Sequence, residues 1–307
     1  DIEITIAEVL KEKGYQTAHI GKWHLGCLPE DPELNHPQPV EQGFDYSLGT
    51  ENNAQPSHHN PVNFVRNGKV VGPVQGYSCR ILANEVKHWL INKHHKKEPF
   101  FLYVAFHEPH AVVASPPELV EKYSDYPPKA AEYLANIENL DLAVGEIIDY
   151  LKRNSLFENT LILFSSDNGS YRQVSNGDLR AVKSYLYEGG IRVPGIVHWS
   201  GFNTKNIVID KPAGFVDVMP TICDLVDAAP PENLDGTNIL SLLQGKEFNR
   251  ENPLYWFFYR TSPEIAVRVD EYMILGKDND SIPRSHRFSA PDMKYIQEMD
   301  MAEFELY

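Results

Sequence analysis

The segment from Gly14 to Gly26 reads GYQTAHIGKWHLG and contains a lysine and a histidine two residues apart, Lys22 and His24. A short strand-like run precedes them and stops at Gly21. If the backbone stays extended past this glycine, the two side chains point to the same side, because strand side chains alternate. A fixed ammonium beside an imidazole is suited to holding an anionic oxygen and transferring a proton. Taken alone, the pattern is more often an ordinary surface loop, so the interpretation depends on residues further along the chain.

A second predicted strand also ends in residues that could do chemistry. The apolar run from Phe100 to Phe106 is typical of a strand buried on both faces, and His107 and His110 follow it. In an open α/β sheet, ligands bind outside the carboxyl ends of the strands. His110 is therefore a candidate catalytic residue, although a capped loop histidine explains it as well. His107 lies closer to the strand and could equally be buried.

A third predicted strand, from Thr160 to Phe164, ends in half a set of metal ligands. Asp167 and Asn168 provide two hard oxygen ligands in a row, and Gly169 permits a sharp turn after them. Hard ligands suit Ca²⁺ or Mg²⁺ better than zinc. An ordinary turn also explains the pattern, and two ligands do not complete a calcium site, so further carboxylates must come from elsewhere.

Two loops carry further candidates. Lys183 precedes the segment EGGIR, in which we expect Glu188 and Arg192 to form an architectural ion pair. His58 and His59 lie in a long polar stretch that could face a substrate, although an exposed loop also explains them. Two lysines, two histidines and half a metal site suit a charged oxyanion ester. The residues therefore predict hydrolysis of sulfate or phosphate esters, and spacing does not choose between them.

The composition limits the class of protein. The chain has 307 residues, a net charge of −15 at pH 7 and a pI of about 5.2. An acidic surface argues against non-specific binding to nucleic acid or to anionic membranes, and no apolar run approaches transmembrane length. Cys27, Cys79 and Cys223 are widely spaced, which indicates neither a disulfide framework nor a zinc site. We therefore expect neither nucleic-acid nor membrane partners.

Helical and strand patterns alternate along most of the chain. Helices are predicted over Ile4–Lys13, Tyr77–Lys93, Ala130–Arg153 and Phe215–Val226, with a further strand over Ile191–Trp199 and an Asn-Gly hairpin within 64–71. Buried strands alternating with helices indicate an α/β fold with a mostly parallel sheet covered on both faces. After about Gly245 the pattern changes to antiparallel strands. We predict a core over residues 1–248 and a smaller C-terminal antiparallel sheet over 249–307.

Taken in order, these motifs closely resemble those of the type I sulfatases, the arylsulfatase A-like family of the alkaline phosphatase superfamily. The matching segments are Gly14-Tyr15-x-Thr17, Gly21-Lys22-Trp23-His24-Leu25-Gly26, Phe106-x-x-Pro109-His110, Ser166-Asp167-Asn168-Gly169, Lys183, and Glu188-Gly189-Gly190-Ile191-Arg192-Val193-Pro194. The resemblance runs from about Thr5 to Leu243. It implies an alkaline-phosphatase-like α/β core with a smaller C-terminal sheet.

The resemblance also implies roles for the candidate residues. Lys22 and His24 would hold the sulfate and the nucleophile, whereas His110 and Lys183 would contact the sulfate or its leaving oxygen. The family often has proline and glycine where Asp178 and Ala181 stand, so the loop that presents Lys183 departs from the family pattern at two positions. The implied substrate is a sulfated carbohydrate or a small sulfate ester, which His58 and His59 would help to bind.

Other features of the family concern the metal and the nucleophile. Asp167 and Asn168 would be two ligands of an active-site Ca²⁺, in preference to Mg²⁺. The family nucleophile is a formylglycine made from a Cys/Ser-x-Pro/Ala-Ser-Arg motif, which this sequence does not contain. Cys27-Leu28-Pro29 imitates its first half, but Glu30 follows. The paired aspartates that complete the calcium site are also missing. In the family both features lie upstream of the point where this chain begins, so we expect a fragment that is inactive alone.

The sequence therefore predicts a sulfuric ester hydrolase acting on a sulfated carbohydrate. By the resemblance, it would work in the periplasm, outside the cell, or in a lysosome. Two alternatives stay open. One is a phosphodiesterase or phosphonate hydrolase of the same superfamily, and the other is a non-catalytic remnant that binds sulfated glycans.

Overall fold

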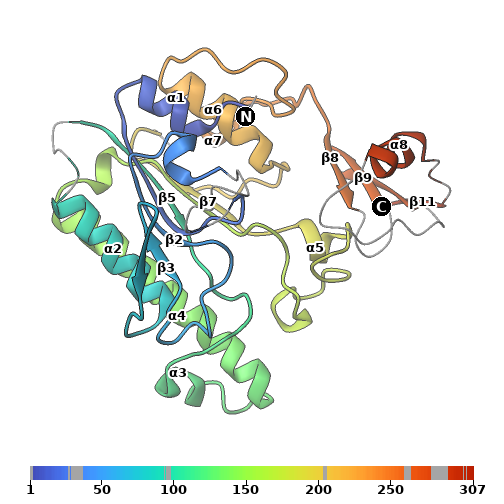
Figure 1. Cartoon of the computed structure of the whole chain (residues 1–307). Coiled ribbons are helices and arrows are strands. Elements are labelled where there is room, and N and C mark those ends of the chain that lie inside the picture. Colours follow the sequence, from blue (N-terminus) through green and yellow to red (C-terminus); the bar gives the residue numbers. More distant parts are fainter. Residues whose placement is uncertain are drawn as a thin grey trace. The chain divides into compact units, whose positions relative to one another are not determined.

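A computed structural model describes most of the chain. It describes residues 3–26, 28, 37–92, 94, 98–202, 206–258, 264–277, 290–299, 301 and 303–307. The chain divides into two compact units, Asp1–Glu158 and Asn159–Tyr307, and each is described here by itself (Figure 1). The boundary expected after residue 248 stays a prediction. Cys27 and its neighbours from 29 to 36 lie outside the described residues.

The first unit contains a five-stranded sheet whose central strands are parallel. Its order is β4-β3-β2-β1-β5. β1 (Gln16–Lys22) lies between β2 (Tyr46–Thr50) and β5 (Phe100–Ala105) and runs parallel to both. β3 (Phe64–Arg66) and β4 (Lys69–Gly72) extend the sheet with antiparallel pairing. The predicted mostly parallel central sheet is confirmed.

Local sequence signals explain several elements of this unit. Before α1 (Ile6–Glu12), Thr5 and Glu8 form a capping box, with the Thr5 hydroxyl accepting from the Glu8 N–H at 3.2 Å and the Glu8 carboxylate accepting from the Thr5 N–H at 2.7 Å. The hairpin of β3 and β4 turns at Asn67 and Gly68, whose φ angles are 46° and 77°. Both angles are left-handed, which is why an Asn-Gly pair suits this turn.

Two long helices pack against each other in this unit. α2 (Ser78–Asn92) and α4 (Pro128–Arg153) run side by side, as Figure 1 shows. Buried Cys79, Ala83 and Ala143 form a shared apolar cluster between them. The remaining helical segments of the unit are η1 (Pro39–Gln42), α3 (Pro117–Glu121) and η2 (Phe157–Asn159).

The second unit contains two small antiparallel sheets. One pairs β6 (Ile162–Ser165) with β7 (Gly195–His198). The other has the order β11-β10-β9-β8, with bounds Glu303–Leu306, Tyr272–Lys277, Glu264–Val269 and Leu254–Phe258. Its helical segments are η3 (Gln173–Ser175), α5 (Glu188–Ile191), η4 (Phe215–Asp217), α6 (Val218–Leu225), α7 (Leu240–Leu243) and α8 (Ala290–Glu298). The predicted C-terminal antiparallel sheet is confirmed.

Three strand predictions differ from the structure, and one strand was not predicted. β5 lies at the edge of its sheet and its Tyr103 is 48 % exposed, so this strand is not buried on both faces. β6 pairs antiparallel with β7, and its Leu163 and Phe164 are exposed. The predicted strand from Ile191 is shorter, because its first residue belongs to α5 and β7 begins at Gly195. β2 was not predicted, because its sequence YSLGT is only weakly apolar, yet all five residues are buried.

Candidate active site

Gly21 lets β1 and β5 approach each other at the end of the sheet that carries Lys22. Its φ angle is 124°, and a Cβ atom there would lie 1.9 Å from the carbonyl oxygen of Ala105. A side chain at this position would therefore push the strands apart. The ends of the two strands, with their following loops, lie at the same edge of the sheet because the strands are parallel.

Lys22 ends β1 opposite Thr50 of β2. Its ammonium group donates to the side-chain oxygen of Asn53 at 3.3 Å. The N–H of His24 donates to the carbonyl of Glu51 at 2.7 Å, but the φ angle of His24 is 52° and its side chain is exposed. Lys22 and His24 were expected to point to the same side because the backbone was assumed to stay extended. The backbone of His24 is left-handed instead, so this assumption does not hold.

A buried histidine that the sequence did not single out supports the end of β1. His19 is 0 % exposed, and its Nε2–H donates to the backbone carbonyl of Lys22 at 3.1 Å, because a carbonyl can only accept. Its Nδ1 then accepts from the hydroxyl of Ser47 at 3.0 Å. Burial lowers the pKa of His19 to about 4. The ring is therefore neutral at neutral pH and fixes the backbone from which Lys22 projects.

His107 is buried, as one of the two sequence interpretations allowed. The Thr50 hydroxyl donates its single proton to the carbonyl of Asn52 at 2.7 Å. The 2.8 Å contact between Thr50 Oγ1 and His107 Nε2 must therefore have the ring N–H donating. Burial, followed by the nearby charges of His58 and Lys22, lowers the pKa of His107 to about 3. His107 is thus a neutral residue whose single ring N–H ties two strand ends together.

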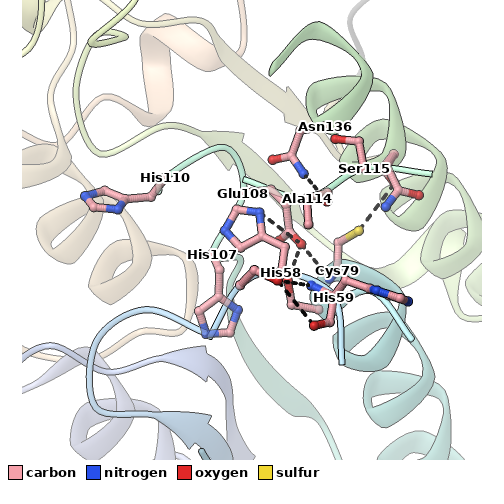
Figure 2. Close-up of polar contacts among 12 residues, drawn as sticks. His58, His59, Cys79, His107, Glu108, His110, Ala114, Ser115 and Asn136 are labelled. Carbon is pink, nitrogen blue, oxygen red and sulfur yellow. Dashed lines mark hydrogen bonds and ion pairs between the residues drawn. The ribbon is translucent and has the colours of Figure 1, made fainter. Parts of the chain in front are cut away.

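His110 lies beyond β5 on a partly exposed loop. Its backbone N–H donates to the carbonyl of His107 at 2.9 Å, and its Nδ1 lies 3.1 Å from the carbonyl oxygen of Ala111. Nδ1 therefore carries a proton, and Nε2 is the nitrogen directed to other partners. In Figure 2 the His110 ring points away from the buried cluster around Glu108.

The two histidines of the polar loop have different environments. His58 is 0 % exposed, and its Nδ1 lies 4.0 Å from Oε1 of the buried Glu108 (Figure 2). Burial lowers the pKa of His58, and the neighbouring carboxylate opposes that shift. His59 is exposed, and its ring stacks on Tyr77 with the centroids 4.7 Å apart. His59 is therefore accessible to a substrate, whereas His58 is buried in the interior of the unit.

Asp167 and Asn168 form a turn after β6 in the second unit. Asp167 is exposed, and its carboxylate accepts from the Ser166 hydroxyl at 3.5 Å. The Asn168 amide donates to the carbonyl of Gly169 at 2.9 Å, a bond that does not use its side-chain oxygen. Both residues offer hard oxygen ligands and fit a Ca²⁺ ion chemically. Within the residues that the structure describes, no group of three or more His, Cys, Asp or Glu side chains is arranged to hold a metal. Asp167 and Asn168 alone provide fewer ligands than a Ca²⁺ ion takes.

The loop that carries Lys183 is attached to this turn by backbone hydrogen bonds. The N–H of Lys183 donates to Ser170 at 3.0 Å, and the N–H of Gly169 donates to Gly190 at 2.8 Å. Ala181 has a φ angle of 66°, a conformation that favours glycine, which the family often has there. The second unit thus brings Lys183 close to the predicted metal ligands.

Glu188 makes the predicted contact and one that was not predicted. Its carboxylate lies 3.1 Å from Arg192 and 2.7 Å from Arg268 of β9. The second contact joins α5 to the four-stranded sheet. This supports a structural role for the pair.

Comparisons with known proteins identify the family. The Sulfatase family matches residues 2–228, and the family described as N-sulphoglucosamine sulphohydrolase, C-terminal, matches residues 181–279. The uncharacterized sulfatase YdeN of Escherichia coli (strain K12) is 31 % identical over 269 residues, which cover 80 % of this chain and 48 % of YdeN. Human arylsulfatase A is 30 % identical over 310 residues, which cover 88 % of this chain and 57 % of that enzyme.

Solved structures agree with these matches. The crystal structure of Ps i-CgsB in complex with k-i-k-neocarrahexaose superposes with a TM-score of 0.78 at 27 % identity, covering 89 % of this chain and 65 % of that one. The chain spans about half the length of the curated relatives it matches. Its α/β architecture and its ordered motifs are those of the alkaline-phosphatase-like sulfatases, and the chain belongs to the sulfatase family.

Proposed function

We propose that the full-length protein hydrolyses sulfate esters of carbohydrates. The observation that carries this proposal is the placement of Lys22 at the end of β1 and of His110 in the loop after the adjacent parallel strand β5, in a chain of the sulfatase family. Ligands of open α/β sheets bind at this edge. An ammonium and an imidazole there suit an anionic ester whose leaving oxygen gains charge.

The contacts of the two residues support distinct roles. The carbonyl of Lys22 is held by His19 and its ammonium by Asn53, so its charge is fixed where an anionic sulfate would sit. His107 beside it is neutral, so Lys22 supplies the charge of that pair. His110 would act on the leaving oxygen through Nε2, because its Nδ1–H is engaged by the Ala111 carbonyl, and it would donate a proton from Nε2 in the doubly protonated form of the ring. His24, exposed beside Lys22, would contact the sulfate or the nucleophile.

The second unit carries candidate residues of its own. Asp167 and Asn168 would hold a Ca²⁺ ion, which when bound supplies positive charge that stabilises the oxygens of the transferred group. Lys183, on the loop attached to that turn, would contact the sulfate. We expect the nucleophile, a formylglycine, to come from a part of the full-length protein outside these 307 residues.

The substrate and the compartment are part of the proposal. The solved relative Ps i-CgsB was crystallised with a neocarrahexaose, and the exposed His59 with Tyr77 offers an aromatic surface on which a sugar ring could stack. Sulfated carbohydrates are encountered in the periplasm, outside cells or in lysosomes, and we place the protein there. Among the described residues, no helix is long and apolar enough to cross a bilayer.

A matched panel of esters tests the reaction class. We expect the purified full-length protein to hydrolyse 4-nitrophenyl sulfate and a sulfated oligosaccharide with a higher kcat/KM than 4-nitrophenyl phosphate or a phenylphosphonate monoester. Faster turnover of the phosphorus esters would favour the phosphodiesterase or phosphonate hydrolase alternative. Binding of the oligosaccharide without any hydrolysis would favour the non-catalytic alternative.

A further inference from the structure

Glu108 is a buried carboxylate that the proposed reaction does not use. It is 6 % exposed and lies between two histidines of the loop after β5, His107 and His110. Its Oε1 accepts from the Ser78 hydroxyl and from the backbone N–H of Cys79, the latter at 2.9 Å. Burying a charged group costs free energy unless hydrogen bonds or opposite charges compensate. The burial of Glu108 therefore needs an explanation.

The position of this carboxylate at the start of α2 supplies that explanation. Ser78 and Cys79 are the first two residues of this 15-residue helix. The first N–H groups of a helix have no partner within it, and its N-terminus carries a partial positive charge. Glu108 therefore acts as a cap for α2 that comes from a different segment of the chain. Replacing it with an apolar residue would leave both the hydroxyl and the N–H without this acceptor.

The same helix start also holds the other side of the His110 loop. The N–H of Ser78 donates to the carbonyl of His58 at 2.7 Å, and the N–H of His58 donates to the carbonyl of Val112 at 3.1 Å. The loop is thus anchored at Glu108, before His110, and at Val112, after it. His110 lies between the two anchors along the chain, and Figure 2 shows its ring directed away from Glu108.

Further polar side chains surround this carboxylate. The buried His58 places Nδ1 4.0 Å from Oε1 of Glu108. The side chain of Asn136 on α4 is a hydrogen-bond partner of His58 and, like Glu108, opposes the lowering of the pKa of His58 by burial. The corner around Glu108 is therefore tied to both the polar loop and α4.

We infer that Glu108 is a positioning residue for His110, acting by locking the loop from His107 to Val112 onto the start of α2. Held in this way, the loop keeps the bond from His110 Nδ1 to the Ala111 carbonyl and presents Nε2 outward. The catalytic part of this inference rests on the proposed sulfatase function. The structural part, the dependence of the His110 ring on Glu108, does not.

The test compares Glu108→Ala with Glu108→Gln in the full-length protein. Glutamine keeps an oxygen that accepts from Ser78 and Cys79, so it should restore most of what alanine loses. Glu85→Ala is the matched control, because Glu85 is likewise a buried glutamate but belongs to α2 itself and pairs with Arg66. If Glu108→Ala does not fold, Ser78→Ala takes its place as the test variant, because it removes one hydrogen-bond donor to the Glu108 carboxylate.

Two readouts separate positioning from general stability. Nitrogen-detected NMR of the imidazoles should show the Nδ1–H form of His110 in wild type, Glu108→Gln and Glu85→Ala, and mixed tautomers in Glu108→Ala. Steady-state hydrolysis of 4-nitrophenyl sulfate should show kcat lowered by about 10-fold to 100-fold in Glu108→Ala with KM changed less than about 3-fold, since misplacement near the chemistry costs about this much. Glu108→Gln and Glu85→Ala should stay within about 5-fold of wild type.

Specific results would overturn the inference. An unchanged His110 tautomer in folded Glu108→Ala or Ser78→Ala would show that the loop does not depend on this carboxylate. Equal loss of kcat in Glu108→Ala and Glu108→Gln would show that the hydrogen-bond anchor is not what matters. If wild type hydrolyses no sulfate ester, the proposed function fails, while the NMR comparison still decides the structural part.

Discussion

Lys22 of the first unit is backed by buried histidines, whereas Asp167 of the second unit lies on an exposed turn. Behind Lys22 lie His19 and His107, both buried and both neutral at neutral pH. Asp167 is exposed, and the loop of Lys183 contains the left-handed Ala181. The difference teaches that buried hydrogen bonds of the fold itself fix the backbone and strand ends around Lys22 in the first unit. In the second unit, Asp167 and Asn168 would be held in place by the ion that we propose they bind.

Removing a metal ligand should have the largest effect, because the second unit offers few described ligands to replace it. We expect Asp167→Ala in the full-length protein to lower kcat/KM by about 10³-fold and to abolish calcium binding, since a metal contributes several kcal/mol of charge stabilisation. Asp178→Ala, an exposed aspartate in the same unit, is the matched control. Metal analysis after gel filtration checks the ligand role, and an unchanged calcium content in Asp167→Ala would contradict it.

Removing a preorganised cation or proton donor should have the next largest effect. Lys22→Ala and His110→Ala should each lower kcat by about 10²-fold or more, the scale for a positioned donor. Lys69→Ala removes an exposed lysine from β4 and should leave kcat unchanged. Steady-state kinetics on an aryl sulfate measures all three. Wild-type turnover in both Lys22→Ala and His110→Ala would contradict the proposed catalytic roles of these two residues.

The buried histidines of the first unit make its stability depend on pH. The folded pKa values of about 4 for His19 and about 3 for His107 lie below the ordinary 6.5, so unfolded chains bind these protons more tightly. Their contribution to stability is present above pH 6.5 and is lost as the pH falls toward 4. From about pH 6.5 to about pH 5.5 we expect the free energy of unfolding to fall by about 2 kcal/mol from these two groups.

Urea unfolding at the two pH values measures this loss. His107→Gln keeps an amide N–H that can donate to Thr50 but cannot titrate. Its loss of stability over the same interval should be smaller by about 1 kcal/mol, the share of one histidine. An identical loss in variant and wild type would show that His107 does not titrate as its burial predicts.

The smallest effect should come from the exposed face of the polar loop. His59→Ala should raise KM for a sulfated oligosaccharide by about 3-fold to 10-fold without changing kcat, because a stacking contact contributes about 1 kcal/mol. It should leave KM for 4-nitrophenyl sulfate unchanged, since that substrate has no sugar. Equal effects on both substrates would place His59 in the chemistry instead.

Local signals in the sequence predicted most of the elements, and long-range contacts account for what was missed. The capping box of α1 and the Asn-Gly hairpin depend on neighbours within a few residues, so they could be predicted. β2 is weakly apolar and is a strand because β1 and β3 pair with it on either side. β6 looked like a buried parallel strand, but apolar composition alone does not determine a partner.

The site shows the same division. Motif residues such as Lys22, His110 and Asp167 could be chosen from their types and spacing at strand ends. The residues that hold them, among them His19, Asn53 and Glu108, could not, because each acts on a partner that only the fold brings near. His19 had a signal, since a histidine inside an apolar strand is expensive to bury without a partner. His58 was expected at a substrate, and burial places it in the interior instead.

The most direct test of the account is the nucleophile of the full-length protein. Reading the coding sequence upstream of Asp1 should reveal Cys or Ser in a Cys/Ser-x-Pro/Ala-Ser-Arg motif preceded by paired aspartates. Peptide mass spectrometry of the purified protein should then find that Cys or Ser converted to formylglycine. A full-length protein without the motif, or one whose motif residue stays unmodified and which hydrolyses no sulfate ester, would contradict the proposed function.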